Sequence, residues 1–212
     1  MKSPLSRLLA FDRAVIGEFK IQGPVAGVDE AGRGPLAGPV VAAAVVFLRE
    51  TLLPGLNDSK QVSEKRRKSL FLQIASCAAT GIGIATEEEI DQINIYQASR
   101  LAMKRAVLAL CCTPAFLLID GKAGVDLPLA QKSVVDGDAK SAAIAAASIV
   151  AKTYRDAWMC YLDEIYPAYH FRKHKGYATA AHLEAIRAAG PSPVHRKTFA
   201  PVRASAGEKC EA

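Results

Sequence analysis

Cysteine and histidine are scarce, and their spacing does not suit a disulfide-stapled or zinc-bound fold. The chain has five cysteines and four histidines among 212 residues, and no two cysteines form a C-x-x-C pair. Because the cysteine count is odd and two cysteines are adjacent, neither a disulfide framework nor a structural zinc site is expected. Reduced thiols are typical of the cytosol, so we expect a cytoplasmic protein.

Long hydrophobic runs are also missing. No segment reaches the roughly 18 to 20 apolar residues that a membrane-spanning helix needs, and the apolar run 142–151 is short and flanked by lysines. Residues 1–15 are basic but contain Asp12 and no clear cleavage site, so a signal peptide is not expected. We therefore expect no membrane partner.

The chain has no internal repeat and no long low-complexity segment, and half of its residues are apolar. This composition predicts one domain with a substantial core. We place an N-terminal extension at 1–24, the domain, including a C-terminal helical portion, at 25–203, and a frayed tail at 204–212. We expect a monomer, although the sequence does not determine the oligomeric state.

Positive charge is in modest excess, with 27 Lys and Arg against 21 Asp and Glu. Residues 170–203 contain seven Lys or Arg and a single acid, Glu184. Such a stretch is often an ordinary solvated face, but it also suits binding to a polyanion.

Apolar segments predict a mixed sheet. Residues 25–29 and 40–48 read as strands, and the short loop between them favours an antiparallel pair. Further strands are predicted at 82–85, 115–120 and 133–136.

Helices are predicted at 63–79, from Thr86 onward, at 141–166 and at 179–189. Thr86 and Glu89 have the spacing of a capping box. The run AAASIVA predicts a helix face packed closely on the sheet. Strands followed by interleaved helices indicate an α/β sandwich. The inner stripe of the helix after Thr86 is expected to comprise Ile90, Ile93, Leu101, Ala102 and Val107.

Carboxylates follow three strand-like segments. Asp29 and Glu30 end the first strand, Asp120 ends the segment AFLLID, and VVDGD supplies Asp136 and Asp138. Aspartate is unfavourable within a strand, and buried carboxylates are costly unless they are paired or bound to metal. Hard oxygen ligands favour Mg²⁺ or Mn²⁺ over zinc.

The order of motifs resembles bacterial ribonuclease HII, a type 2 ribonuclease H family, over about residues 25–203. The matching segments are GVDEAGRGPLAGPVVAAAV from Gly27, NDSK at 57–60, LLIDG at 117–121, GD at 137–138, AAASIVAKTYRD at 145–156, HKGYAT at 174–179 and HRKTFAPV at 195–202. One departure is Asp136, where the family often has lysine. The related ribonuclease HIII carries an extra N-terminal domain, for which the 24 residues before the first strand are too few.

The resemblance implies a ribonuclease H-like fold, a mixed sheet flanked by helices, and four catalytic and metal-binding acids: Asp29, Glu30, Asp120 and Asp138. It implies substrate contacts from Gly32, Arg33 and Gly34 and from Tyr177, the tyrosine of HKGY. We also expect Lys60 to lie near a phosphate, and His174 and Lys175 to support the loop of Tyr177.

The expected partners are RNA–DNA hybrids and DNA duplexes that contain ribonucleotides. The expected reaction is endonucleolytic hydrolysis, with two Mg²⁺ or Mn²⁺ ions, on the 5′ side of the ribonucleotide. Two alternatives remain open. A nucleotide-binding phosphotransferase would use Gly32–Gly34 as a phosphate cradle, but the chain lacks a GxxxxGK[ST] loop. A non-catalytic hybrid-binding module would leave the buried acids without a purpose.

Overall fold

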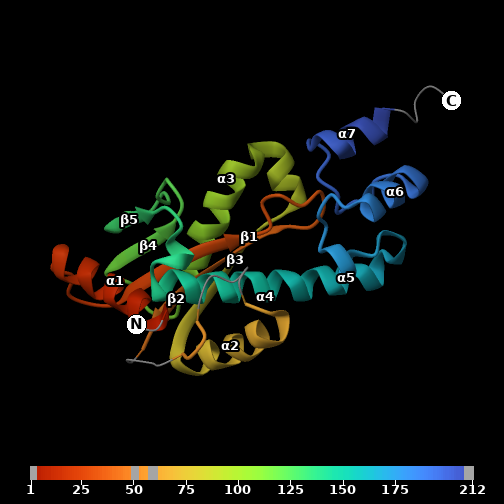
Figure 1. Cartoon of the computed structure of the whole chain (residues 1–212). Coiled ribbons are helices and arrows are strands. Elements are labelled where there is room, and N and C mark those ends of the chain that lie inside the picture. Colours follow the sequence, from red (N-terminus) through yellow and green to blue (C-terminus); the bar gives the residue numbers. More distant parts are fainter. Residues whose placement is uncertain (1–3, 49–52, 57–61, 208–212) are drawn as a thin grey trace.

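The computed structural model describes residues 4–48, 53–56 and 62–207. Five strands form one sheet, and helices surround it (Figure 1). The strands are β1 (Val25–Ala31), β2 (Val40–Phe47), β3 (Ala78–Ala85), β4 (Phe116–Asp120) and β5 (Gln131–Val134). The α-helices are α1 (Pro4–Glu18), α2 (Glu64–Cys77), α3 (Glu87–Leu108), α4 (Ala142–Ile165), α5 (Phe171–His174), α6 (Ala180–Ala189) and α7 (Ala200–Gly207). Two short 3-10 helices are η1 (Gly137–Ala139) and η2 (Pro167–Tyr169).

The sheet is mixed, as predicted, and its strand order is β3-β2-β1-β4-β5. β1 pairs antiparallel with β2, and β2 pairs antiparallel with β3. β1 pairs parallel with β4, with Val28 opposite Ile119, and β4 pairs parallel with β5. Since parallel strands end at the same edge of a sheet, the residues that follow Val28 and Ile119 lie side by side.

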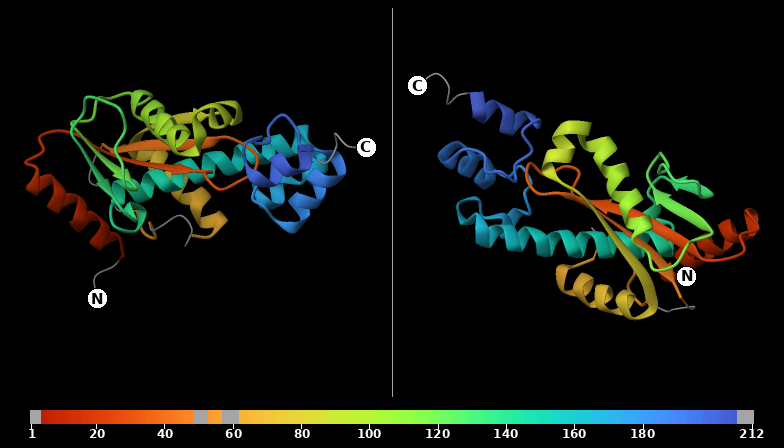
Figure 2. Two further views of the ribbon diagram at one scale, coloured as in Figure 1. Left: turned by 90° about the horizontal axis from the view of Figure 1, so that it is seen from above. Right: turned by 180° about the vertical axis from the view of Figure 1, so that it is seen from behind.

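Helices cover both faces of the sheet, with α3 on one side and α4 on the other (Figure 2). α1, α2 and α4 share a core with Ala43 and Val45 of β2, whereas α3 packs with their neighbours Ala42 and Ala44. This alternation is the period-two pattern of a strand buried on both faces. The α/β sandwich expected from the sequence is therefore confirmed.

The alanine-rich start of α4 packs directly on β1. Residues 142–151 are all buried, which confirms the predicted helix face. At Gly27 of β1, a Cβ atom would lie 2.0 Å from the carbonyl carbon of Ala143. Only glycine lets the two backbones approach this closely.

The segment before the sheet is part of the packed structure. Leu8 and Val15 of α1 are buried in two of the core clusters. Asp12 accepts a hydrogen bond from the backbone N–H of Ala143, at the positive end of α4. At the other end of the chain, α7 extends to Gly207 and includes the first residues of the expected tail.

α3 differs from the expected continuous amphipathic helix. Its capping box of Thr86 and Glu89 is present, but Asn94 has a φ of 66° and kinks the helix. The Asn94 carboxamide oxygen then accepts hydrogen bonds from the backbone N–H groups of Tyr96 and Gln97, and so caps the second half. The kink breaks the predicted stripe: Ile90, Ala102 and Val107 are buried, Leu101 is half-buried and Ile93 is exposed.

The C-terminal helices form a small bundle beyond the end of the sheet (Figure 1). Their core joins the second half of α4 to the loop after β1, through Met159, Phe171, Leu36 and Ala37. Within the described ranges, no helix is long and apolar enough to cross a membrane.

Candidate active site

Three carboxylates meet where β1 and β4 end. Asp29 and Glu30 lie near the end of β1, and Asp120 is the last residue of the parallel strand β4. Asp29 and Glu30 are consecutive strand residues, yet the charge of Asp120 raises the pKa of both. The structure therefore brings together three of the four acids predicted from the sequence.

Burial and mutual repulsion oppose ionisation of these acids. Burial raises the pKa of Asp29 well above its usual value, and the charges of Glu30 and Asp120 add to this effect. Burial also raises the pKa of Glu30, while the guanidinium of Arg33, 3.2 Å from its Oε1, acts in the opposite direction. Buried like charges of this kind are favourable only with a compensating positive charge.

Local hydrogen bonds orient these side chains. The Asp29 carboxylate accepts from the backbone N–H of Glu30 at 2.7 Å, and a hydrogen bond with the Ser148 hydroxyl lowers its pKa. Asp120 accepts from the backbone N–H of Gly137, also at 2.7 Å. Ser148 lies in the alanine-rich run of α4, for which the sequence predicts only packing on the sheet.

The segment after β5 separates its two aspartates. Asp136 is exposed and has a φ of 54°, whereas Asp138 is buried in η1. η1 is anchored to the site because its Gly137 donates to Asp120. Asp138 therefore directly follows Gly137, which is bonded to the acid cluster, whereas Asp136 faces solvent.

A divalent cation fits the chemistry of this cluster. The Oε2 atom of Glu30 is buried and has no hydrogen-bond partner in the described structure. The carboxyl group to which it belongs lies beside those of Asp29 and Asp120. In the described part of the chain, however, no three acidic, histidine or cysteine side chains already stand close enough to hold a metal ion. Among the described residues, Arg33 is the cation that acts on these acids, where it lowers the pKa of Glu30.

The Gly32–Gly34 loop follows the acids directly and lies beside Tyr177. Gly32 has a φ of 99°, and a Cβ atom at this position would lie 2.0 Å from Nε of Arg155. A Cβ atom at Gly34 would lie 3.7 Å from the Tyr177 ring, which is 45 % exposed. The predicted substrate-binding residues of the loop and Tyr177 are therefore neighbours, and the tyrosine is accessible.

Two buried arginines hold this loop. Arg196 donates to the carbonyl oxygens of Gly32, Arg33 and Gly38, at distances from 2.6 to 3.0 Å. Arg155 donates to the carbonyl oxygens of Ala37, Pro39 and Lys175.

Both guanidinium groups are fully buried. Burial lowers the pKa of Arg155 to about 10 and that of Arg196 to about 9, so both remain charged at neutral pH.

The interpretation of residues 170–203 as one basic face is wrong for Arg196. Its side chain is inside the protein, so it is not available to a polyanion. Arg172 and Arg187 are exposed, but they pair with Glu164 and Glu184 at 2.9 and 3.0 Å. The positive charge of this stretch is therefore partly structural and partly neutralised.

A chain of histidines supports the loop of Tyr177. His182 Nδ1 lies 2.9 Å from the carbonyl oxygen of Tyr177, so that nitrogen carries a hydrogen and Nε2 is an acceptor. His195 Nε2, 3.0 Å away, must then donate to His182 Nε2. His195 Nδ1 is left to accept from the backbone N–H of Ser192. The Ser192 hydroxyl also lies 2.8 Å from Nδ1, and with the Ser192 N–H donating to that nitrogen both His182 and His195 are neutral.

His174 supports the same loop, as expected. Its Nδ1 accepts a hydrogen bond from the backbone N–H of Gly176. Its carbonyl oxygen accepts one from the backbone N–H of Tyr177. Lys175 contributes its own carbonyl oxygen to Arg155. The predicted phosphate contact Lys60 lies outside the described residues.

Comparisons with known proteins place this fold and its acid cluster in the ribonuclease H class of metal-dependent nucleases. The family model for ribonuclease HII matches residues 26–202. A ribonuclease HII of Geobacillus kaustophilus is 56 % identical over 180 residues, covering 84 % of this chain and 69 % of the relative. One from Geobacter sulfurreducens is 53 % identical over 185 residues, covering 87 % and 85 %.

Solved structures agree with the family model. The crystal structure of ribonuclease H2 from Pyrococcus horikoshii superimposes with a TM-score of 0.75 at 26 % identity, covering 89 % of this chain and all of that one. The chain belongs to the ribonuclease HII family and has ribonuclease H endonuclease activity.

Proposed function

We propose that this enzyme cuts the RNA strand of RNA–DNA hybrids, and cuts DNA duplexes on the 5′ side of an embedded ribonucleotide. The observation that carries the proposal is the cluster of Asp29, Glu30 and Asp120, whose charges act on one another beside an accessible glycine loop and tyrosine. Water attacks phosphorus in line and the 3′-oxygen leaves. The products are a 3′-hydroxyl and a 5′-phosphate.

Asp29, Glu30, Asp120 and Asp138 are the proposed metal ligands. These four residues would hold two Mg²⁺ or Mn²⁺ ions, which would supply Lewis acidity to activate the attacking water and to offset the negative charge that develops at the phosphate. The protein's own part is to keep the carboxylates in place: Ser148 orients Asp29, and Gly137 orients Asp120. A site built of carboxylate side chains suits these cations, because Mg²⁺ and Mn²⁺ prefer oxygen ligands.

Substrate choice depends on the 2′-hydroxyl, the group that distinguishes RNA from DNA locally. We assign its recognition to the backbone of Gly32–Gly34 and to the Arg33 guanidinium, which is about half exposed in its side chain. Tyr177 is the proposed stacking surface for the sugar at the RNA–DNA junction. Lys60 is proposed to bind a nearby phosphate.

We further propose that the enzyme works as a cytoplasmic monomer. The described cysteines are all free thiols, which suits a reducing compartment. Sedimentation of the purified protein with and without duplex tests the monomeric state directly.

The test is cleavage of a DNA duplex that contains one ribonucleotide, with the cut position mapped in Mg²⁺, in Mn²⁺ and with chelator. We expect a cut 5′ of the ribonucleotide that requires the cation. Asp120→Asn keeps the shape of the side chain and should abolish cleavage while circular dichroism shows an intact fold. The exposed neighbour Asp136→Asn is the matched control and should retain activity. Robust cleavage by Asp120→Asn would remove Asp120 from the site.

A further inference from the structure

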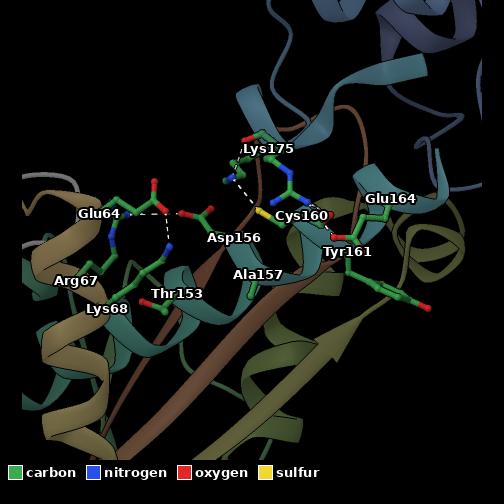
Figure 3. A pocket seen from close by; sticks show the side chains of 11 residues that line it. Glu64, Arg67, Lys68, Thr153, Asp156, Ala157, Cys160, Tyr161, Glu164 and Lys175 are labelled. Atoms are coloured by element: carbon green, nitrogen blue, oxygen red, sulfur yellow. Dashed lines mark hydrogen bonds and ion pairs between the residues drawn. The ribbon is translucent and has the colours of Figure 1, made fainter. Parts of the chain in front are cut away.

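A cavity of about 400 Å³ lies between α2 and the second half of α4, below Lys175, which follows α5 (Figure 3). None of the four proposed metal ligands lines it. Its lining includes Arg67, Lys68, Thr153, Asp156, Cys160 and Lys175.

Two polar atoms of this cavity lack a partner. Nε of Arg67 and Oγ1 of Thr153 are buried and make no hydrogen bond in the described structure. The other contacts of Arg67 are long: 3.4 Å to the carbonyl oxygen of Val62 and 3.9 Å to the carboxylate of Asp156. Burying unpaired donors is unfavourable, so a guest that accepts hydrogen bonds would be stabilised here once a small rotation of the Arg67 or Thr153 side chain turned these closed-off atoms toward the cavity.

The described carboxylates neutralise the positive charge in the inner part of the cavity only weakly. Asp156 is already engaged by Lys152 at 2.6 Å, a much closer pair than its contact with Arg67. Lys175 donates to the carbonyl oxygen of Arg172 and to the Cys160 thiol, and no described carboxylate lies within ion-pairing distance of its Nζ.

The acids at the cavity mouth are already paired. Glu64 binds Lys68 at 2.8 Å, and Glu164 binds Arg172 at 2.9 Å. The inner cations and the unpaired donors therefore select an anion with several oxygen acceptors, and a phosphate group meets that description.

We propose that this cavity binds a backbone phosphate of the nucleic-acid duplex, at a site separate from the acid cluster. The inference rests on the proposed function for the identity of the duplex. Lys175 precedes Tyr177 by two residues, and Lys152, the partner of Asp156, lies 6.0 Å from the centre of the Tyr177 ring. Lys152 does not line the cavity, but its pairing with Asp156 and the position of Lys175 in the chain link the cavity to the segment that carries Tyr177, and we infer that a strand bound at Tyr177 can reach it.

The test measures binding separately from cleavage. Fluorescence anisotropy in chelator, over a series of salt concentrations, gives the affinity for an all-DNA duplex and for one with a single ribonucleotide. Arg67→Gln should weaken binding to both duplexes about tenfold and reduce the slope of log affinity against log salt by about one, as expected for the loss of one phosphate contact. Thr153→Val should weaken both about threefold without changing the slope.

Lys104→Gln is the matched control, because it removes one positive charge from α3, on the other face of the sheet, where Lys104 pairs with Asp126. It should leave affinity and slope unchanged. Unchanged affinity and slope in a folded Arg67→Gln protein would overturn the proposal, and unchanged affinity in Thr153→Val would do so if Arg67→Gln does not fold.

A second arm distinguishes the source of the phosphate. If inorganic phosphate raises the melting temperature of the unmodified protein at matched ionic strength, while Arg67→Gln binds duplexes normally, the site takes free phosphate and the backbone assignment is wrong. A slope reduced by about one in Arg67→Gln would support the cavity even if no cleavage occurred 5′ of a ribonucleotide. In that case only the proposed function would fail.

Discussion

Acid should weaken the fold through His195. Its side chain is 1 % exposed, and burial together with the neighbouring His182 lowers its pKa from 6.5 to about 4. Both ring nitrogens are used in the neutral form, since Nδ1 accepts from Ser192 and Nε2 donates to His182. A proton on Nδ1 would place a donor opposite the Ser192 N–H group.

The sign and size of the effect follow from the two pKa values. Because the pKa is lower in the folded protein, the unfolded chain binds the proton more tightly between about pH 6.5 and 4. The contribution to stability is fully present above the upper value and is lost as the pH falls. From near pH 7 to near pH 5 the loss is about 2 kcal/mol for a group that titrates alone.

Asp12 acts in the opposite direction and would hide this loss in a single curve. Burial raises its pKa from 3.8 to about 6, so it costs stability at neutral pH and recovers about 1 kcal/mol by pH 5. The informative quantity is therefore a difference between variants, in which the contribution of Asp12 cancels.

The assay is urea unfolding near pH 7 and near pH 5 for the parent and for His195→Gln. The glutamine variant is expected to be less stable at both pH values, but its loss on acidification should be smaller than the parent's by about 2 kcal/mol. His170→Gln, at an exposed histidine outside the chain of hydrogen bonds, should behave as the parent. Parallel pH dependence of the parent and His195→Gln would refute the reasoning.

Three further substitutions test the packing and the loop. Gly27→Ala should cost about 3 kcal/mol in urea unfolding, because its Cβ would overlap the backbone of Ala143, whereas Gly17→Ala, with open space around it, should cost nothing. Arg196→Lys should lose at least about 3 kcal/mol, because one ammonium cannot reach all three carbonyl oxygens. Tyr177→Ala should lower kcat/KM on a single embedded ribonucleotide about tenfold with little effect on the cation concentration needed, and an unchanged rate would argue against the contact.

Several features of the site could be predicted because the signal is local. An apolar strand that runs into Asp29, and another that runs into Asp120, predicts carboxylates at strand ends without knowledge of the partner strands. The parallel pairing of Val28 with Ile119 then brings these ends together. The capping box of Thr86 and Glu89 could also be predicted from the sequence, since both residues lie within one helical turn.

The supports of the site could not be predicted, because their partners are remote in sequence. Arginine usually lies on the surface, so Arg196 reads as part of a basic face until the fold places the carbonyl oxygens of Gly32 and Gly38 around it. Ser148 reads as a small packing residue until α4 lies against Asp29. Asn94 is polar and compatible with a helix, and only its backbone geometry reveals the kink.

The buried arginines also suit this loop to its proposed role of facing an anionic substrate. Carbonyl oxygens repel phosphate oxygens, and a glycine-rich loop without large side chains exposes its carbonyl groups readily. In this loop the carbonyl oxygens of Gly32, Arg33 and Gly38 are bound by Arg196, and those of Ala37 and Pro39 by Arg155. Because its carbonyl oxygens point inward at two charged guanidinium groups, the loop presents less negative potential to the proposed nucleic-acid strand. The same hydrogen bonds hold the positive φ of Gly32 in place.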